Sequence, residues 1–79
     1  MNVAELMEMI SRRQGDMSNE RYARNLDVSG TTLFRWRKGE RAPNLETIRN
    51  MAKYYKQQGD TEMLDALSAY ALFGENPLS

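Results

Sequence analysis

Apolar residues recur three and four positions apart along most of the chain, which is the spacing of one face of an α-helix. Polar cap residues and glycines divide this pattern into five segments. We expect helices that begin after Asn2, Ser18, Ser29, Asn44 and Asp60 or Thr61, and that end at Gly15, Asp27, Gly39, Gln58-Gly59 and about Phe73. No segment convincingly predicts a strand, so the pattern indicates an all-α fold.

The stretch from Ser18 to Gly39 predicts two short helices joined by a tight turn. Their inward residues are Tyr22, Ala23 and Leu26 in the first helix, and Leu33 and Trp36 in the second. Asp27 occupies the turn, where a left-handed backbone is expected. A residue other than glycine adopts that conformation at a cost of about 1 kcal/mol.

The second of these helices carries short polar residues near its start and basic residues near its end. Ser29, Gly30, Thr31 and Thr32 are poor helix formers, so a purely structural helix gains little from them. A helix with this arrangement can enter the major groove of DNA. The alternative is a plain packing unit, in which the two helices only complete a core.

Charge is unevenly distributed, although the formal net charge is zero. The segment from Arg21 to Lys56 holds nine of the eleven Lys and Arg residues but three of the eleven acidic residues. Both ends of the chain are acidic. A basic middle between acidic ends favours one face for a polyanion, and the alternative is a solvated surface with chance clustering.

The run from Ser18 to about Tyr55 resembles the phage-repressor/Cro type of helix-turn-helix, the XRE family. The resemblance is carried by Ser18–Ala23, Val28-Ser29, Thr32-Leu33, Arg35-Trp36, Lys38-Gly39 and Arg41-x-Pro43. It implies a five-helix bundle of the lambda-repressor-like type that binds double-stranded DNA. Asp27 stands where the family usually has glycine, and Gly30 and Phe34 stand at outward positions where it often has polar residues that read bases.

Five residues of the helix that begins after Ser29 are candidates for base readout. Arg35 matches the two major-groove acceptors of guanine, with a phosphate contact as its alternative. Thr31 is the next candidate by the family's pattern, whereas Thr32 could lie partly inward and bond the backbone. Phe34 could contact thymine methyl groups, pack on a sugar or lie against the preceding helix. Gly30 offers close backbone approach only.

Phosphate contacts are expected from residues that flank this helix or start a neighbouring one. The candidates are Asn19, Ser29, Arg37, Lys38, Arg41 and Asn44. For each of them a helix cap or a solubilising charge is the alternative, and for Ser29 and Asn44 the cap and the phosphate contact can coexist.

The fifth helix is apolar over more of its circumference than one core stripe requires. We expect Met63, Leu67, Tyr70 and Ala71 to pack on the rest of the chain. The remaining strip of Leu64, Ala69, Leu72 and Phe73 would then be exposed and predicts a homodimer interface. The alternative is that a small domain uses all of this surface to close its core.

The absence of cysteine and histidine excludes disulfides, thiolate chemistry, the usual zinc ligands and histidine acid–base catalysis. No nucleophile–base pair or metal-ligand cluster is recognisable, and no ligand domain is appended, so we expect no catalytic residue, metal, cofactor or small-molecule ligand. We further expect one domain over residues 1–79, no membrane segment and a cytoplasmic, nucleoid-associated location. The preferred interpretation is a dimeric repressor that binds a palindromic operator. The alternative is a protein-interaction module that binds another protein, such as a toxin or a nuclease, on the same scaffold.

Overall fold

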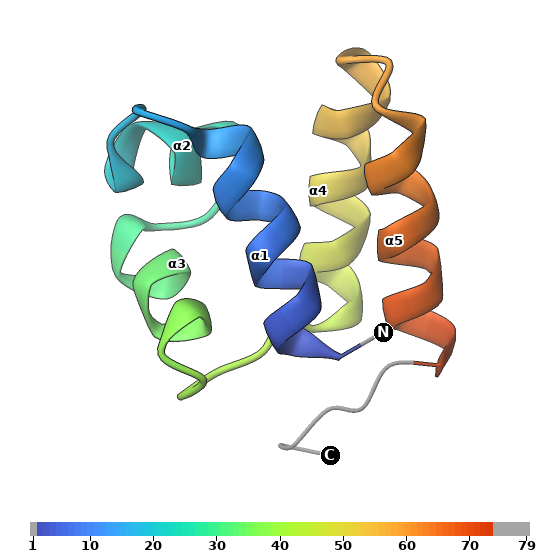
Figure 1. The fold of residues 1–79 in the computed structure, drawn as a ribbon, viewed down its shortest axis with the longest axis horizontal. Coiled ribbons are helices and arrows are strands. Elements are labelled where there is room, and N and C mark those ends of the chain that lie inside the picture. The colour runs from blue at the N-terminus through green and yellow to red at the C-terminus, as the bar shows by residue number, and fades with distance from the viewer. Residues whose placement is uncertain (1, 74–79) are drawn as a thin grey trace.

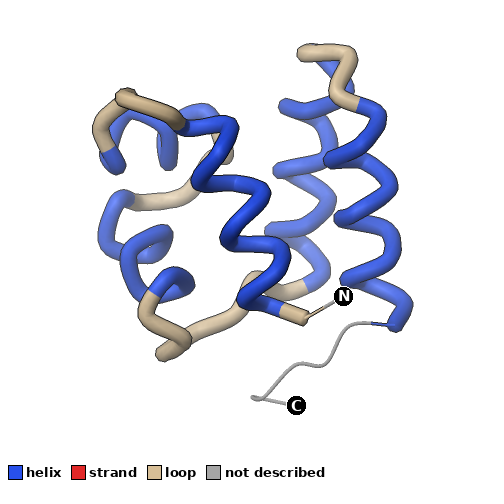
Figure 2. The backbone as a smooth tube through the Cα atoms, viewed as in Figure 1, coloured by secondary structure: helices blue, strands red, loops and turns tan. Residues whose placement is uncertain are grey.

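The computed structural model describes residues 2–73 and confirms the all-α prediction. Its helices are α1 (Val3–Gln14), α2 (Asn19–Asn25), α3 (Gly30–Arg37), α4 (Leu45–Gln57) and α5 (Thr61–Phe73), shown in Figure 1. No strand occurs within residues 2–73 (Figure 2). The described part of the chain is therefore organised by the packing of helices.

Each helix begins where a polar side chain accepts a hydrogen bond from an otherwise unpaired backbone N–H group. The acceptors and donors are Asn2 and Glu5 (2.8 Å), Ser18 and Arg21 (3.2 Å), Ser29 and Thr32 (3.0 Å), and Asn44 and Thr47 (2.9 Å). Asp60 Oδ1 accepts from the N–H of Met63 at 3.2 Å, so Asp60 rather than Thr61 caps α5. Caps of this kind contribute about 1 kcal/mol each, which explains why these residues locate the helix starts.

The helices pack as two pairs with α1 between them. Helices α2 and α3 form one pair, and α4 and α5 run antiparallel as the other (Figure 1). Helix α1 contacts both α3 and α5, so it joins the two pairs.

One core draws residues from all five helices. Its buried side chains are Val3, Leu6, Met7, Ile10, Tyr22, Ala23, Leu26, Leu33, Trp36, Ile48, Met51, Tyr55, Met63, Ala66, Leu67 and Tyr70. The predicted inward residues of α2 and α3 are all among them, so those predictions are confirmed. Because no charged side chain of the described residues is buried, every Lys and Arg there reaches the surface.

The prediction for α5 is partly wrong. Met63, Leu67 and Tyr70 pack inward as expected, but Ala71 is exposed and Ala66 takes its place in the core. Leu64 was expected on the exposed strip, yet it is half-buried and packs against the core. Ala69 is half-buried, and Leu72 is 74% exposed as predicted. The side chain of Phe73 lies outside what the structure describes.

Candidate nucleic-acid interface

The turn between α2 and α3 places α3 on the surface at a fixed angle to α2. Asp27 has φ of 61°, the left-handed conformation predicted for it. The N–H of Val28 then donates to the carbonyl of Ala23 at 3.0 Å, and Ser29 caps the next helix. These local bonds turn the chain sharply, so that α3 begins directly after α2 ends.

Helix α3 presents a continuous stripe to solvent, here called the outward face, made of Thr31, Phe34, Arg35 and Lys38. Leu33 and Trp36 are buried, and at about 100° per residue the four outward residues fall on the opposite side of the helix. All four are exposed. Thr31 and Arg35 are one turn apart, which groups a hydroxyl, a ring, a guanidinium and an ammonium on one accessible surface.

Phe34 and Lys38 contact each other on this face. Phe34 is 52% exposed, and Lys38 Nζ lies 5.0 Å from the centroid of its ring. That distance is within the range of a cation–π interaction. Phe34 is therefore accessible on this face, and its three predicted settings stay predictions.

The two other base-readout candidates, Thr32 and Gly30, are not part of the outward face. Thr32 is half-buried, and its Oγ1 accepts a 2.9 Å hydrogen bond from Ser29 Oγ. The predicted outward placement of Gly30 is wrong, because its missing Cβ points at α2. A Cβ there would lie 3.0 Å from Cγ and 3.3 Å from Cα of Glu20, so glycine lets the two helices approach closely.

Two of the phosphate candidates, Asn19 and Arg37, meet in a chain of hydrogen bonds at the edge of α3. Asn19 Nδ2 donates to the carbonyl of Gly30 at 3.2 Å, and Asn19 Oδ1 accepts from Arg37 Nη1 at 2.7 Å. Arg37 Nη2 donates to Gln14 Oε1, and Gln14 Nε2 donates to the carbonyl of Met17. This chain ties the start of α2 to both ends of α3, a positioning role that the sequence pattern did not indicate.

The remaining phosphate candidates are dispersed around α3. Lys38 is on the outward face, Ser29 caps α3, Arg41 is exposed in the following loop, and Asn44 caps α4. Ser29 and Asn44 use their side-chain oxygens for capping. The cap function of these two residues is thus present in the free protein.

The basic segment from Arg21 to Lys56 differs from the rest of the described molecule in its ion pairing. The ion pairs within residues 2–73 involve Arg12 with Glu8, and Arg13 with Asp60 and Glu62. None of the nine cations between Arg21 and Lys56 pairs with a described carboxylate. Their charge is available to an external anion, which fits the sequence-level prediction of a polyanion surface.

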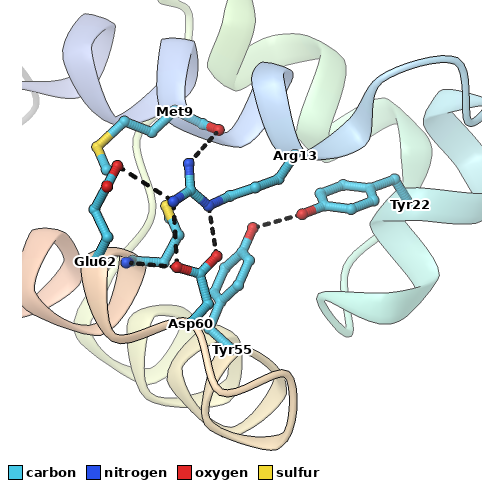
Figure 3. A network of polar contacts seen from close by, with 7 residues as sticks. Met9, Arg13, Tyr22, Tyr55, Asp60 and Glu62 are labelled. Carbon is cyan, nitrogen blue, oxygen red and sulfur yellow. Dashed lines mark hydrogen bonds and ion pairs between the residues drawn. The ribbon is translucent and has the colours of Figure 1, made fainter.

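A second polar cluster lies at the junction of α1, α4 and α5 (Figure 3). Arg13 donates to Asp60 through Nε at 2.6 Å and Nη2 at 3.2 Å, to Glu62 at 3.3 Å, and to the Met9 carbonyl at 3.3 Å. These hydrogen bonds hold the pKa of Asp60 below its usual value and raise that of Arg13. The sequence offered no signal for this cluster, because its partners lie 47 positions apart.

A pocket of about 140 Å³ opens beside this cluster and is lined by Arg13, Tyr22, Tyr54, Tyr55, Gln58 and Asp60. Four of its polar side chains bond in pairs: Arg13 donates to Asp60, and the hydroxyl oxygens of Tyr22 and Tyr55 are 2.9 Å apart. No cluster of metal-ligating side chains occurs in the described part of the chain. The outward face is therefore the best candidate for a functional surface.

The helix-turn-helix model HTH_3 matches residues 10–59, more than half of the chain. The chain belongs to this family, the phage-repressor/Cro (XRE) helix-turn-helix proteins. No curated protein and no solved structure is significantly similar to the chain. The predicted resemblance is thus confirmed, and family membership assigns the chain to DNA-binding transcription regulators.

The family match runs from within α1 to the connection between α4 and α5. It includes the outward face of α3 and every phosphate candidate, but it leaves α5 outside.

The described helices include none that is both long and apolar enough to cross a membrane.

Proposed function

We propose that this chain is a sequence-specific repressor that binds a palindromic DNA operator as a homodimer. The observation that carries the proposal is the outward face of α3, which is exposed and whose two cations make no ion pair within residues 2–73. A surface helix of this composition fits the major groove, whose width of about 12 Å admits an α-helix. An operator of a phage, a plasmid or a bacterial operon is the expected target, and the bound protein would lie on the nucleoid.

Arg35 and Thr31 are the proposed base-reading pair. The Arg35 guanidinium is exposed and makes no ion pair with the described residues, so its fork is free to donate two hydrogen bonds to guanine. Thr31 is exposed one turn earlier and can reach a neighbouring base pair. Thr32 is a weaker candidate, since its hydroxyl oxygen already accepts from Ser29. Gly30 contributes by keeping α2 and α3 close.

Lys38, Arg41, Ser29 and Asn44 are the proposed phosphate contacts on either side of the reading helix. Asn19 and Arg37 belong to the same set, but their hydrogen bonds to each other give them a positioning role as well. Each cation that meets a phosphate releases counterions from DNA, so affinity should fall steeply with salt.

A second copy is proposed because one small module rarely gives useful specificity alone. A single module buries roughly 600–1,000 Å² of its surface on DNA, and a two-fold dimer doubles that contact. The exposed part of α5, centred on Leu72, is the proposed dimer surface. Leu64 and Ala69 are half-buried, and their exposed parts would belong to the same surface.

The decisive experiment is a titration of the protein with mixed-sequence DNA at several salt concentrations, followed by selection of preferred sites. The proposal expects binding at low salt, a steep loss with added salt and a palindromic selected site. Absence of binding at low salt contradicts DNA binding, and binding without any preferred sequence contradicts the repressor.

Two variants separate base contacts from phosphate contacts. Lys38→Ala should weaken binding to all sequences alike and reduce the salt slope by about one. Arg35→Ala should relax preference at one position of the selected site. Equal losses on every sequence for Arg35→Ala would assign Arg35 to phosphate instead.

Light scattering tests the dimer. The wild type should have the mass of two chains at high micromolar concentration, and Leu72→Glu should reduce it to one. Leu45→Glu is the matched control, because Leu45 is 55% exposed on a different helix and should leave the mass unchanged. A wild type that is monomeric under these conditions contradicts the homodimer and favours the alternative, in which Leu72 meets a different protein.

A further inference from the structure

Phe34 is an unusual residue for the centre of a surface that binds a polyanion. It is one of three large apolar side chains exposed within residues 2–73, and the other two, Leu45 and Leu72, lie on other helices. Phe34 shares its face with Thr31, Arg35 and Lys38 rather than with further apolar groups. About half of the Phe34 surface is buried on the protein, and the rest is accessible to a ligand.

The chemistry of the ring limits what it can recognise. Phenylalanine has no hydrogen-bond donor or acceptor, so at a base edge it can make apolar contact alone. In the major groove the apolar group is the C5-methyl of thymine. At the same position cytosine carries only a hydrogen, and its C4 amino group offers N–H donors where thymine has a carbonyl acceptor.

We infer that Phe34 is a specificity-determining residue that selects a thymine through its C5-methyl group, next to the base pair read by Arg35. This inference rests on the proposed function, since it concerns how the same face reads DNA. Phe34 and Arg35 are adjacent in α3, and both are exposed on the outward face. A guanidinium and a ring side by side therefore read a polar and an apolar feature of neighbouring base pairs.

Lys38 supports this orientation of the ring. Its ammonium lies 5.0 Å from the ring centroid, so the cation and the ring hold each other in place. On DNA the ammonium is then positioned to meet a phosphate while the ring meets the base. A protein partner would need to supply an anion beside an apolar group to satisfy the same pair, whereas a duplex supplies phosphates and thymine methyl groups at every A·T pair.

Replacement of thymine by deoxyuridine in the selected site tests the inference directly. Deoxyuridine pairs with adenine as thymine does but lacks the methyl group. Each thymine of a half-site is replaced in turn, and affinity is measured for wild type and Phe34→Ala. At one thymine the wild type should lose about three- to tenfold in affinity, the effect of burying one methyl group. Phe34→Ala should bind thymine and deoxyuridine equally at that position.

Further measurements exclude other causes. Because Phe34 is half exposed, Phe34→Ala should keep the helical circular dichroism of the wild type. Leu45→Ala removes an exposed apolar side chain elsewhere and should preserve discrimination between thymine and deoxyuridine. At the responsive position 5-methylcytosine should bind more tightly than cytosine.

The outcomes distinguish this inference from the proposed function. If the protein binds a selected site but no thymine responds to replacement, the inference is overturned while DNA binding stands. The same holds if discrimination persists in Phe34→Ala, which would assign the methyl contact to another side chain such as that of Thr31. If no DNA is bound at all, both are overturned.

Discussion

At the scale of single residues, three buried tyrosine hydroxyl groups have different surroundings. The hydroxyl groups of Tyr22 and Tyr55 share a hydrogen bond of 2.9 Å, whereas that of Tyr70 has no partner within residues 2–73. Burial raises the pKa of all three above that of an exposed tyrosine. They are therefore neutral near pH 7, and the hydrogen bond rather than charge decides what each hydroxyl contributes.

Phenylalanine substitutions at Tyr70 and Tyr22 should have opposite effects. Tyr70→Phe removes a buried hydroxyl that has no partner, so we expect the free energy of unfolding to rise by about 1 kcal/mol. Tyr22→Phe leaves the hydroxyl of buried Tyr55 unpaired and should lower the free energy of unfolding by about 1–2 kcal/mol. Urea denaturation of the two variants measures both values. A loss of stability in Tyr70→Phe would show that its hydroxyl has a partner after all.

Asp27 holds a strained backbone conformation in the turn before α3. Because φ at this residue is 61°, Asp27→Gly should relieve strain and raise stability by up to about 1 kcal/mol, or roughly 4–8 °C in melting temperature. Asp27→Ala is the matched control and should be destabilising, since alanine tolerates this conformation less well than aspartate. Thermal unfolding measures both. A gain for alanine would show that the aspartate side chain, not its backbone, limits stability.

At the scale of elements, the spacing of α2 and α3 depends on Gly30. The distances from a Cβ at this residue to Glu20 show that the helices are almost as close as their backbones allow. The hydrogen bond from Arg37 to Asn19 holds the same two helices at one edge, and the bond from Arg37 to Gln14 ties α3 to the end of α1. The orientation of the outward face relative to α2 is therefore set by contacts within the free protein.

Gly30→Val should disturb this spacing. Its extra methyl groups cannot all avoid Glu20, so we expect a loss of about 1–3 kcal/mol in unfolding free energy, together with weaker DNA binding. Thr31→Val is the control for stability, because that residue is exposed one position later and should change stability by less than about 0.5 kcal/mol. Equal stabilities of the two variants would mean that Glu20 and α2 yield without cost.

The helices and their caps were predictable from the sequence because the interactions that create them are local. Asn2, Ser18, Ser29 and Asn44 each bond a group three positions away, and the apolar stripes repeat within one helix. The inward side of Gly30 and the hydrogen bond from Arg37 to Gln14, 23 positions away, depend on how helices meet. Periodicity does not encode those distances, so the exposure of Thr31 and Arg35 was predictable and the contacts that position α3 were not.

At the scale of the whole molecule, the cations fall into two groups, those that pair with carboxylates of the fold and those that do not. Arg12 and Arg13 pair with carboxylates within the fold, while the cations from Arg21 to Lys56 make no such pair within residues 2–73. Arg13 joins the end of α1 to the start of α5, which are far apart in sequence (Figure 3). One part of the basic content thus stabilises the fold, and the larger part is left for an anionic partner.

The Arg13–Asp60 pair makes stability depend on pH in a defined direction. Hydrogen bonds from Arg13 lower the pKa of Asp60 in the folded state, so near and below pH 4 the unfolded chain binds more protons than the folded one. The stability that Asp60 contributes is therefore fully present above the pKa that it has in the unfolded chain. This stability is lost as pH falls through the pKa that Asp60 has in the folded state. Asp60→Asn should keep the cap of α5, because asparagine caps as well as aspartate does.

Unfolding free energies measured from pH 7 to pH 2 for wild type and Asp60→Asn test this dependence. The variant should be less stable at pH 7 by about 1.5–3 kcal/mol, the value of a hydrogen bond to a charged group. The two curves should converge as the wild type loses its ion pair in acid. Glu8→Gln is the control: Glu8 is 64% exposed and pairs with an exposed Arg12, so its curve should follow the wild type closely. A constant difference between wild type and Asp60→Asn at every pH would assign the contribution of Asp60 to packing or capping instead of charge.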